Sequence, residues 1–418
     1  RIKLLIAARK SSGKPSPSMF HVVIASLLVG AAADVCTGSN YTFTLWLDPH
    51  VSSTGYYKVE ECGDVANPTL GMELGVEYRF LQHNASNHMH AIGFAYYPDG
   101  AHKEVDELEP GIAPTSTSTC ADDFSCQSPK YYRDGEYLGD DGEDFGLDVY
   151  EPEFFYPRAD WREHEYEARL TVSEVPDSGD IFYFCHIHDD MSARIKILED
   201  GVEVNSDDTP ELGYSYETPS AFDQTCGTYG VGNYTEDSGV CSDTFLCLDG
   251  DETDDQVQFA DCLYAVDCQM DYEMRTNLHE SSALATFMHQ MIPHHINAIN
   301  MAKLILKLAS DELQGEEELT DVMWDIINSQ NYQIDIMQAW LDDNGYETEI
   351  DAICDLCSDS SAWYKTGETD KDCDWVSNWE PRCNAKGSGS GGVLTTASDA
   401  CPKACGACSS GAASRFRG

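Results

Sequence analysis

Basic residues are scarce in this chain. Its 418 residues include 25 Lys and Arg against 74 Asp and Glu, so the formal net charge is -49 at pH 7. A protein with this charge repels nucleic-acid phosphates and anionic lipid surfaces. Nucleic-acid binding is therefore excluded as a leading function, and acidic runs such as 140–144 and 249–255 are typical of solvated loops.

Long apolar runs are also scarce. One run, from Phe20 to Ala33, follows Met19 and ends in small residues before the polar Asp34. It is too short for a membrane span but has the length of a signal peptide. We therefore assign residues 1–33 to a signal-peptide region and expect no membrane span in the mature chain. The basic segment before Met19 either extends this region or precedes the true start of the chain.

Cysteine, in contrast, is abundant. Seventeen cysteines indicate an oxidising compartment, and together with the signal-peptide region they predict a secreted, extracellular protein with disulfide bonds. Three sequons, at Asn40, Asn84 and Asn233, agree with secretion and predict a glycoprotein.

The most informative stretch is 182–197. It begins with an aromatic run typical of a strand and ends with alternating isoleucines typical of another. Between them lie Cys185, His188 and Met191, each three residues from the next. A second histidine from elsewhere in the chain would complete a trigonal His2Cys site with a weak axial Met, which suits copper in electron transfer.

The spacing Cys185-x-x-His188-x-x-Met191 resembles the ligand loop of small blue-copper proteins of the amicyanin and plastocyanin type, the cupredoxins. This resemblance implies a type 1 copper site. Period-2 alternation at 41–47 and 78–81 predicts strands, so we expect residues 34–202 to form a β-sandwich cupredoxin domain.

In cupredoxins the upstream histidine ligand precedes a strand. His90 is our choice for this ligand because the apolar run 92–97 starts directly after it, and His88 is the alternative. We expect His83, His102 and His186 at surface or hydrogen-bonded positions. Adjacent strand residues face opposite ways, so His186 should point away from the side taken by Cys185.

The two halves of this site are separated by an unusually long stretch. Its excess, 104–158, contains Cys120 and Cys126 and is interpreted as a disulfide-tied excursion over the surface. The sequence around Cys185 is also similar to the His-Cys-His motif of multicopper oxidases. Asp190 stands where that family has a further histidine, so a trinuclear oxygen-reducing centre is not expected.

A cysteine-rich connection follows at 203–270. Its five cysteines lie among Gly, Asp, Thr and Ser with little periodicity, which predicts a disulfide-held linker. If Cys185 is a metal ligand, the other sixteen cysteines form an even number that can all pair. Because five is odd, one cysteine of this segment should find its partner outside it, with Cys354 as the candidate.

Residues 271–350 show helical periodicity over 271–308 and again over 316–341, which predicts two antiparallel helices. The first contains several Met and His residues and a proline, Pro293, that should kink it. Thioethers favour Cu(I) and imidazoles accept either oxidation state, so one interpretation is that this hairpin holds copper. The competing interpretation is ordinary core packing, the usual role of Met at helical spacing.

This segment resembles a family of ferritin-like helical domains, DUF305. Its signature Met-Ile-Pro-His-His stands at 291–295, and Ala-Ile-x-Met-Ala stands at 298–302. Because some members of that family bind copper, the resemblance implies a second copper site at Met291, His294, His295 and Met301. The acidic residue that often begins the family's first motif is Leu284 here.

The last segment, 351–410, contains six cysteines besides Cys354 and is similar to the ShK-toxin-like (ShKT) module, stapled by three disulfides. A zinc site is disfavoured by the intervening cysteines and the secreted context. Such modules usually mediate interactions, and 411–418 is interpreted as a tail.

Together these features predict a multidomain fold: a β-sandwich, then an α-helical hairpin or bundle, then a small disulfide-rich module. The leading hypothesis is a secreted copper-binding protein with a type 1 electron-transfer site at His90, Cys185, His188 and Met191, a helical copper-handling domain, and a redox partner protein. The alternatives are copper sequestration without redox turnover, an extracellular metal oxidoreductase, and a surface protein whose copper domain has decayed. No substrate-site signature is present, which favours a non-enzymatic carrier.

Overall fold

A computed structural model of the chain describes residues 35–103, 105–118, 126–139, 145–204, 210–216, 218–241, 245–276, 282–348, 363–377, 380–388 and 394–405. The predicted signal-peptide region at 1–33 lies outside these ranges. Other sequence-based predictions also fall outside them, at Cys120, Cys354, Cys357, Cys408 and the tail 411–418.

The first half of the chain is rich in strands, which form two sheets. One sheet has six strands in the order β2-β1-β4-β8-β6-β7, and the other has the order β11-β10-β9-β5 with β3 paired to β10. Most neighbours are antiparallel, while β1 pairs with β4 and β3 with β10 in parallel. The strands are β1 (Thr42–Asp48), β2 (Tyr56–Val59), β3 (Leu70–Glu73), β4 (Glu77–Gln82), β5 (Ile92–Ala95), β6 (Lys130–Arg133), β7 (Glu136–Tyr137), β8 (Tyr166–Thr171), β9 (Ile181–Cys185), β10 (Ala193–Glu199) and β11 (Val202–Glu203).

Short helices connect these strands: η1 (Glu60–Cys62), η2 (Ala85–Asn87), η3 (Gly100–Lys103), α1 (Leu147–Glu153) and α2 (Arg158–Trp161). The strands expected at 41–47, 78–81 and 92–97 are present as β1, β4 and β5. The stretch 104–158 differs from expectation. It contributes β6 and β7, and β6 pairs with β8, so this stretch is part of a sheet and not only an excursion over the surface.

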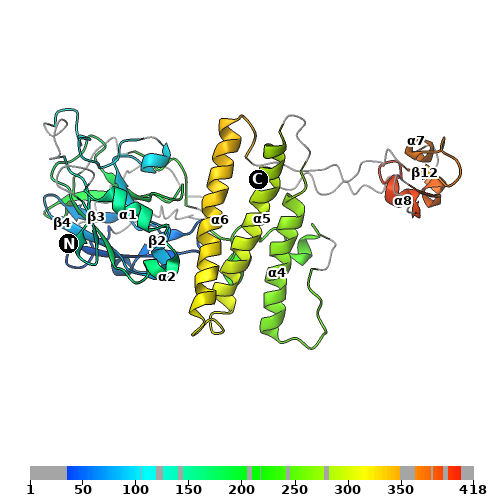
Figure 1. Ribbon diagram of the computed structural model, residues 1–418, viewed down its shortest axis with the longest axis horizontal. Coiled ribbons are helices and arrows are strands. Elements are labelled where there is room, and N and C mark those ends of the chain that lie inside the picture. The colour runs from blue at the N-terminus through cyan, green and yellow to red at the C-terminus, as the bar shows by residue number, and fades with distance from the viewer. Residues whose placement is uncertain are drawn as a thin grey trace, which may run out of the picture. The chain divides into compact units, whose positions relative to one another are not determined.

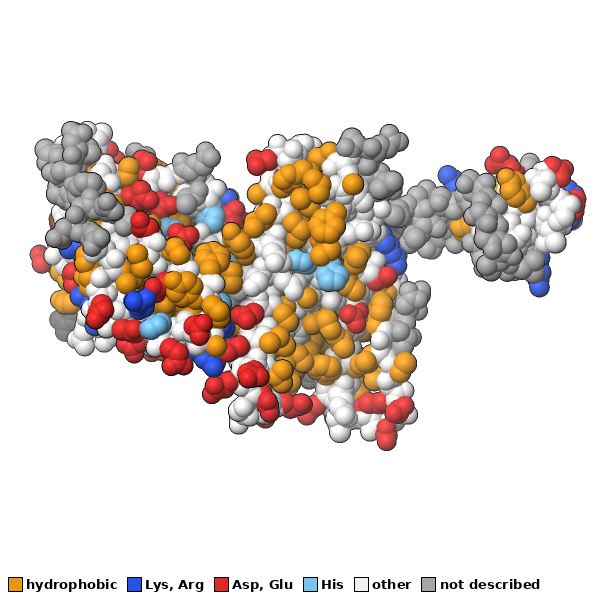
Figure 2. All heavy atoms as spheres, viewed as in Figure 1, with side chains coloured by type: hydrophobic (Ala, Val, Ile, Leu, Met, Phe, Trp, Pro, Cys, Tyr) orange, Lys and Arg blue, Asp and Glu red, His pale blue; other side chains and the backbone are white. Residues whose placement is uncertain are grey.

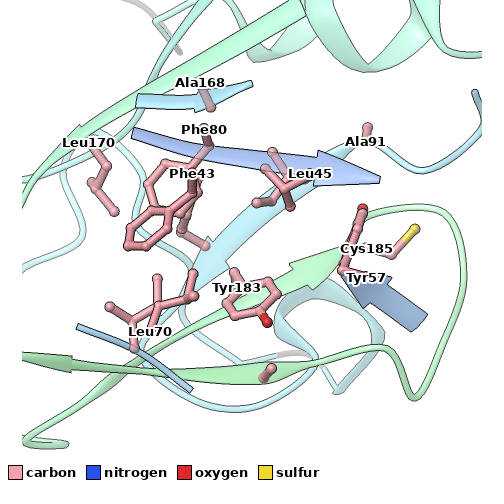
Figure 3. Close-up of a cluster of buried hydrophobic side chains, with 14 of the residues drawn as sticks. Phe43, Leu45, Tyr57, Leu70, Phe80, Ala91, Ala168, Leu170, Tyr183 and Cys185 are labelled. Atoms are coloured by element: carbon pink, nitrogen blue, oxygen red, sulfur yellow. The ribbon is translucent and has the colours of Figure 1, made fainter. Parts of the chain in front are cut away.

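The core between the sheets follows from side-chain alternation. In β4 the exposure alternates, so that Tyr78, Phe80 and Gln82 point inward. Every residue of β9 is buried, because residues on its second face, such as Phe184, are covered by η3 and the segment around it. Figure 3 shows Phe43, Phe80 and Leu170 inside this core and Cys185 at one end of it.

Three long helices make up the second part: α4 (Asp254–Glu273), α5 (Ala283–Leu308) and α6 (Glu317–Asp343). In Figure 1 they lie side by side, with α5 between the other two, and contacts join α5 to both neighbours. Two smaller helices precede them, α3 (Ala221–Cys226) and η4 (Glu236–Ser238).

The helical part corrects two expectations. The helix expected from Asp271 begins at Ala283, where the Ser282 side chain accepts a hydrogen bond from the Ala285 amide and caps it. The segment expected to be a linker contains α4, whose Thr253 and Gln256 form a capping box. The predicted two-helix hairpin is therefore part of a three-helix arrangement, and α5 continues through Pro293.

The last part is small. Its sheet has the order β12-β13-β14, and two disulfides, Cys373–Cys401 and Cys383–Cys405, join its helical segments to the stretch that follows α8. A cluster around Trp363 and Val376 forms its core. Its elements are β12 (Tyr364–Lys365), α7 (Cys373–Ser377), η5 (Glu380–Asn384), β13 (Lys386–Ser388), β14 (Leu394–Thr396) and α8 (Ala397–Ala400).

The other cysteines largely follow the expectation of extensive pairing. Disulfides join Cys36 to Cys62, Cys226 to Cys262 and Cys241 to Cys268, and Cys126 is also disulfide-bonded. Within the described ranges the free cysteines are Cys185, which is buried, and Cys247, which is exposed. The expectation that all cysteines other than Cys185 can pair is therefore wrong at Cys247.

The strand-rich part and α5 and α6 are held together by polar contacts. Lys303 on α5 donates hydrogen bonds to the Ser52 and Ser53 carbonyls, 2.8 and 2.7 Å away. Arg158 forms a buried ion pair with Asp321 on α6. Figure 2 shows acidic side chains outnumbering Lys and Arg on the displayed face, and no helix among the described residues is long and apolar enough to cross a membrane.

Candidate metal centre

Cys185 and His188 are positioned by the turn that follows β9. The strand ends at Cys185 and β10 begins at Ala193. The Cys185 Sγ accepts hydrogen bonds from the backbone amides of Ile187 and His188, each at 3.4 Å, so the chain curls around the sulfur. Asp190 has a φ of 53°, a left-handed conformation that Asp tolerates, and this closes the turn.

His90 comes from the connection between β4 and β5, two residues before β5 begins. Its carbonyl accepts a hydrogen bond from the Tyr57 hydroxyl at 2.7 Å and another from Gln82 Nε2 at 2.6 Å. Gln82 is held in turn by the Tyr150 hydroxyl, which donates to Gln82 Oε1 at 2.6 Å. The main chain at His90 is therefore fixed by buried polar groups from two strands and a helix.

The two histidines meet the cysteine through the same ring nitrogen. His90 Nδ1 and His188 Nδ1 each lie 3.7 Å from Cys185 Sγ. One ligand atom from each of the three residues lies within 4.8 Å of the others, and the two imidazole centroids are 4.5 Å apart. All three side chains are buried, so a thiol and two imidazoles converge on one small space.

Met191 is fully buried and belongs to the same core cluster as Cys185. It lies at the end of the turn, two residues before β10. The structure therefore gathers His90, Cys185 and His188, three of the four predicted ligands, and encloses the fourth in the surrounding core.

Burial sets the protonation of these groups. It raises the pKa of the Cys185 thiol to about 12, although the two amides that donate to the sulfur lower this pKa. It lowers the pKa of His188 to about 4, and burial followed by the proximity of His188 lowers the pKa of His90 well below its ordinary value. At neutral pH both imidazoles are neutral and have a lone pair to offer, while the thiol keeps its proton until a metal displaces it.

One polar residue near the site has no counterpart in the sequence-based prediction: Asn328, on α6. Its side chain is fully buried. Asn328 Oδ1 lies 3.2 Å from His90 Nε2, and the Asn328 carbonyl lies 3.3 Å from His188 Nε2. The only sequence signal was an Asn beside Ile327 on the apolar face of a predicted helix, where a polar residue needs a partner.

The other histidines considered as candidates do not face the sulfur. His88 Nε2 lies 2.7 Å from the Tyr156 carbonyl, so the alternative ligand is directed elsewhere. His102 Nε2 lies 2.8 Å from the Cys185 carbonyl. His186 packs against Phe184, and a Cβ at Gly93 would overlap its ring, which explains the glycine there. His83 is exposed.

An acidic group lies next to the turn. Carboxylates of Asp99, Asp189 and Asp190 have oxygens within 4.8 Å of one another. Lys103 forms ion pairs with Asp189 at 3.3 Å and Asp190 at 3.6 Å. Burial, followed by repulsion from the two neighbouring carboxylates, raises the pKa of Asp99 to about 7. This negative charge favours a positive charge in the adjacent site.

The second predicted set, on α5, is more open. His294 is exposed, Met291 and His295 are half-buried, and Met301 is 39% exposed. The two imidazole centroids are 6.0 Å apart. His295 Nδ1 is buried without a hydrogen-bond partner, and burial lowers the pKa of this ring. Met291 packs against the α5–α6 core, as the core-packing interpretation expects.

Comparison with known proteins identifies one family. Residues 285–388 match the model of DUF305, described as a domain of unknown function. The match begins in α5 and ends in β13, so it extends beyond the segment 271–350 in which the resemblance was noted. No curated protein and no solved structure gives a significant match to the chain.

Proposed function

We propose that the protein is a secreted copper-binding protein whose strand-rich domain is a cupredoxin with a type 1 electron-transfer site. The observation that carries the proposal is the meeting of a buried thiol with the Nδ1 atoms of two neutral imidazoles, each 3.7 Å from the sulfur. These groups come from chain segments nearly a hundred residues apart, so their convergence is a property of the fold.

The donor set fits copper better than other metals. His90, Cys185, His188 and Met191 would hold the ion. Two imidazoles, a thiolate and a buried thioether suit copper in either oxidation state, whereas structural zinc sites use four stronger N or S ligands. Copper held in such a set supplies a one-electron couple.

The protein's own residues do the rest. The Cys185 sulfur accepts hydrogen bonds from two backbone amides, which stabilise its thiolate once the proton has left. Buried Tyr57 and Gln82 hold the His90 main chain, so that ligand needs little rearrangement. Full burial of all four side chains excludes water from the site.

Other features support secretion and copper handling. Five disulfides are present in the described ranges, and the sequon residues Asn40, Asn84 and Asn233 are all exposed. The DUF305-matching helices would bind or pass copper through Met291, His294, His295 and Met301. The terminal module, similar to ShKT modules, would mediate interactions.

The test compares the two free cysteines. The mature chain, Cys185→Ser and Cys247→Ser are purified, loaded with Cu(II), and measured for copper content, visible absorption and reversible reduction. We expect an intense thiolate-to-copper band in the wild type and in Cys247→Ser, and its loss in Cys185→Ser. The exposed Cys247 controls for the loss of a thiol as such.

A wild-type chain that binds copper without that band would contradict the proposal. Copper retained without reversible reduction would favour the alternative of sequestration. Turnover of an added metal ion or reductant that depends on Cys185 would favour the alternative of a metal oxidoreductase.

A further inference from the structure

Asn328 joins the helical part to the candidate centre through three contacts. Its side-chain oxygen faces His90 Nε2 at 3.2 Å, and its main-chain carbonyl faces His188 Nε2 at 3.3 Å. Its amide nitrogen donates to the His88 carbonyl at 2.7 Å. A single residue of α6 thus contacts both imidazoles on the side opposite to Cys185.

These contacts determine which nitrogen of each ring carries the proton. A main-chain carbonyl can only accept, so the His88 carbonyl must face the Asn328 amide nitrogen, and the side-chain oxygen must face His90. That oxygen also only accepts, so His90 Nε2 carries a proton. The same reasoning at the Asn328 carbonyl places a proton on His188 Nε2. A neutral imidazole has one N–H, so both Nδ1 atoms have a free lone pair directed towards the sulfur.

We propose that Asn328 is a positioning residue for the copper site, which selects the ligating tautomer of both histidines and holds α6 against their imidazole edges. This inference rests on the proposed function. It also gives the helical part a role at the strand-rich site that is separate from any copper that the helices themselves bind.

Two consequences follow. Hydrogen bonds from the far nitrogen of a ligating imidazole to fixed acceptors orient the ring and raise its basicity, and removing such a partner typically weakens metal binding about 10- to 100-fold. Because both acceptors belong to α6, binding of the metal and seating of this helix also stabilise each other.

The substitution Asn328→Ala discriminates within one molecule. It removes the side-chain acceptor for His90 but leaves the main-chain acceptor for His188. We therefore expect His90 to lose its fixed Nε2–H tautomer while His188 keeps it. A control is available three residues along α6: Asn331 is also buried, and its amide nitrogen donates to the Ser53 carbonyl at 3.4 Å, away from both ligands.

The first measurement uses the metal-free chain. Imidazole 15N NMR of the full-length wild type should show Nε2–H tautomers at His90 and His188, with only His90 altered in Asn328→Ala and neither altered in Asn331→Ala. The second measurement is copper affinity and the visible band. We expect about 10- to 100-fold weaker binding and a displaced band in Asn328→Ala, and wild-type values in Asn331→Ala.

An Nδ1–H tautomer at His90 in the wild type, or an Asn328→Ala chain indistinguishable from Asn331→Ala, would overturn the inference. If the wild type shows the expected tautomers but takes up no copper, the tautomer assignment is supported and the proposed function is overturned. The two failures are therefore distinguishable.

Discussion

Replacing Lys303 by Met should remove a specific pH dependence of stability. Lys303 is fully buried on α5, and its ammonium donates to the Ser52 and Ser53 carbonyls. These serines lie just before β2, which contains the Tyr57 that holds the His90 main chain. The perturbation therefore acts on a buried polar contact between α5 and the strand-rich part.

The magnitude follows from the Lys303 pKa. Burial lowers it from 10.5 to about 7, against a weaker opposing effect of Asp48. The distance between those two values corresponds to about 5 kcal/mol of unfavourable free energy for the buried ammonium. At pH below about 7 the folded and unfolded states both hold this proton, and the cost is fully present. Between about pH 7 and 10.5 the folded state releases the proton while the unfolded state keeps it.

The unfolded state thus binds more protons in that window, so the free energy of unfolding rises with pH there, by about 1.4 kcal/mol per pH unit. In Lys303→Met this contribution is absent. At a single pH, the difference in the free energy of unfolding between the wild type and Lys303→Met combines two effects: removal of the charge and loss of two hydrogen bonds to carbonyls. The slope of the free energy of unfolding against pH reports only the effect of the charge, so the two chains are compared by this slope.

The assay is equilibrium unfolding of the metal-free, disulfide-intact chain in guanidinium at pH 7 and pH 9, followed by tryptophan fluorescence. Between pH 7 and pH 9 the free energy of unfolding of the wild type should rise by about 2 to 3 kcal/mol relative to that of Lys303→Met. Lys307→Met, an exposed lysine four residues along the same helix, is the matched control and should follow the wild type. Equal pH slopes in the wild type and Lys303→Met would refute the reasoning.

Two further predictions concern ligands. His188→Ala should abolish the intense visible band of the copper-loaded chain. His186→Ala should keep this band, because the His186 ring packs against Phe184 and Gly93 and not at the sulfur. Loss of the band in both variants would contradict the ligand assignment. If α5 binds copper, His294→Ala with His295→Ala should lower the copper content from two ions to one per chain by elemental analysis while leaving the visible band intact. An unchanged copper content would show that these two histidines do not bind copper.

The local grouping of Cys185, His188 and Met191 on one turn was predictable from the sequence because these residues lie within seven positions of one another. Spacing of three between Cys185, His188 and Met191 needs only a tight turn after a strand, and local hydrogen bonds to the sulfur build such a turn. His90 was also predictable from the sequence, since an apolar strand begins two residues after it. The main strands of the first domain and the helices over 283–308 and 317–343 were predictable for the same reason: their apolar residues repeat with a period that a local window detects.

Helix α4 was missed because four of its six buried residues, Ala260, Cys262, Ala265 and Cys268, are small or disulfide-bonded and give little hydrophobic periodicity. Its start was nevertheless encoded in the Thr253 and Gln256 capping box. Strand β6 was missed because its place beside β8 depends on long-range pairing, which no local pattern reports.

The sequence by itself determined the types of the candidate ligands, their spacing around Cys185, the abundance of cysteine and the acidic charge, because each of these is a property of residue identity or of neighbours along the chain. Only the tertiary structure decided which histidine faces the sulfur, that both rings present Nδ1, and that Asn328, 238 residues from His90 and 140 residues from His188, contacts both rings. These outcomes depend on burial and on where separate elements pack. Burial also decides protonation, since the same His and Cys side chains in water would have ordinary pKa values.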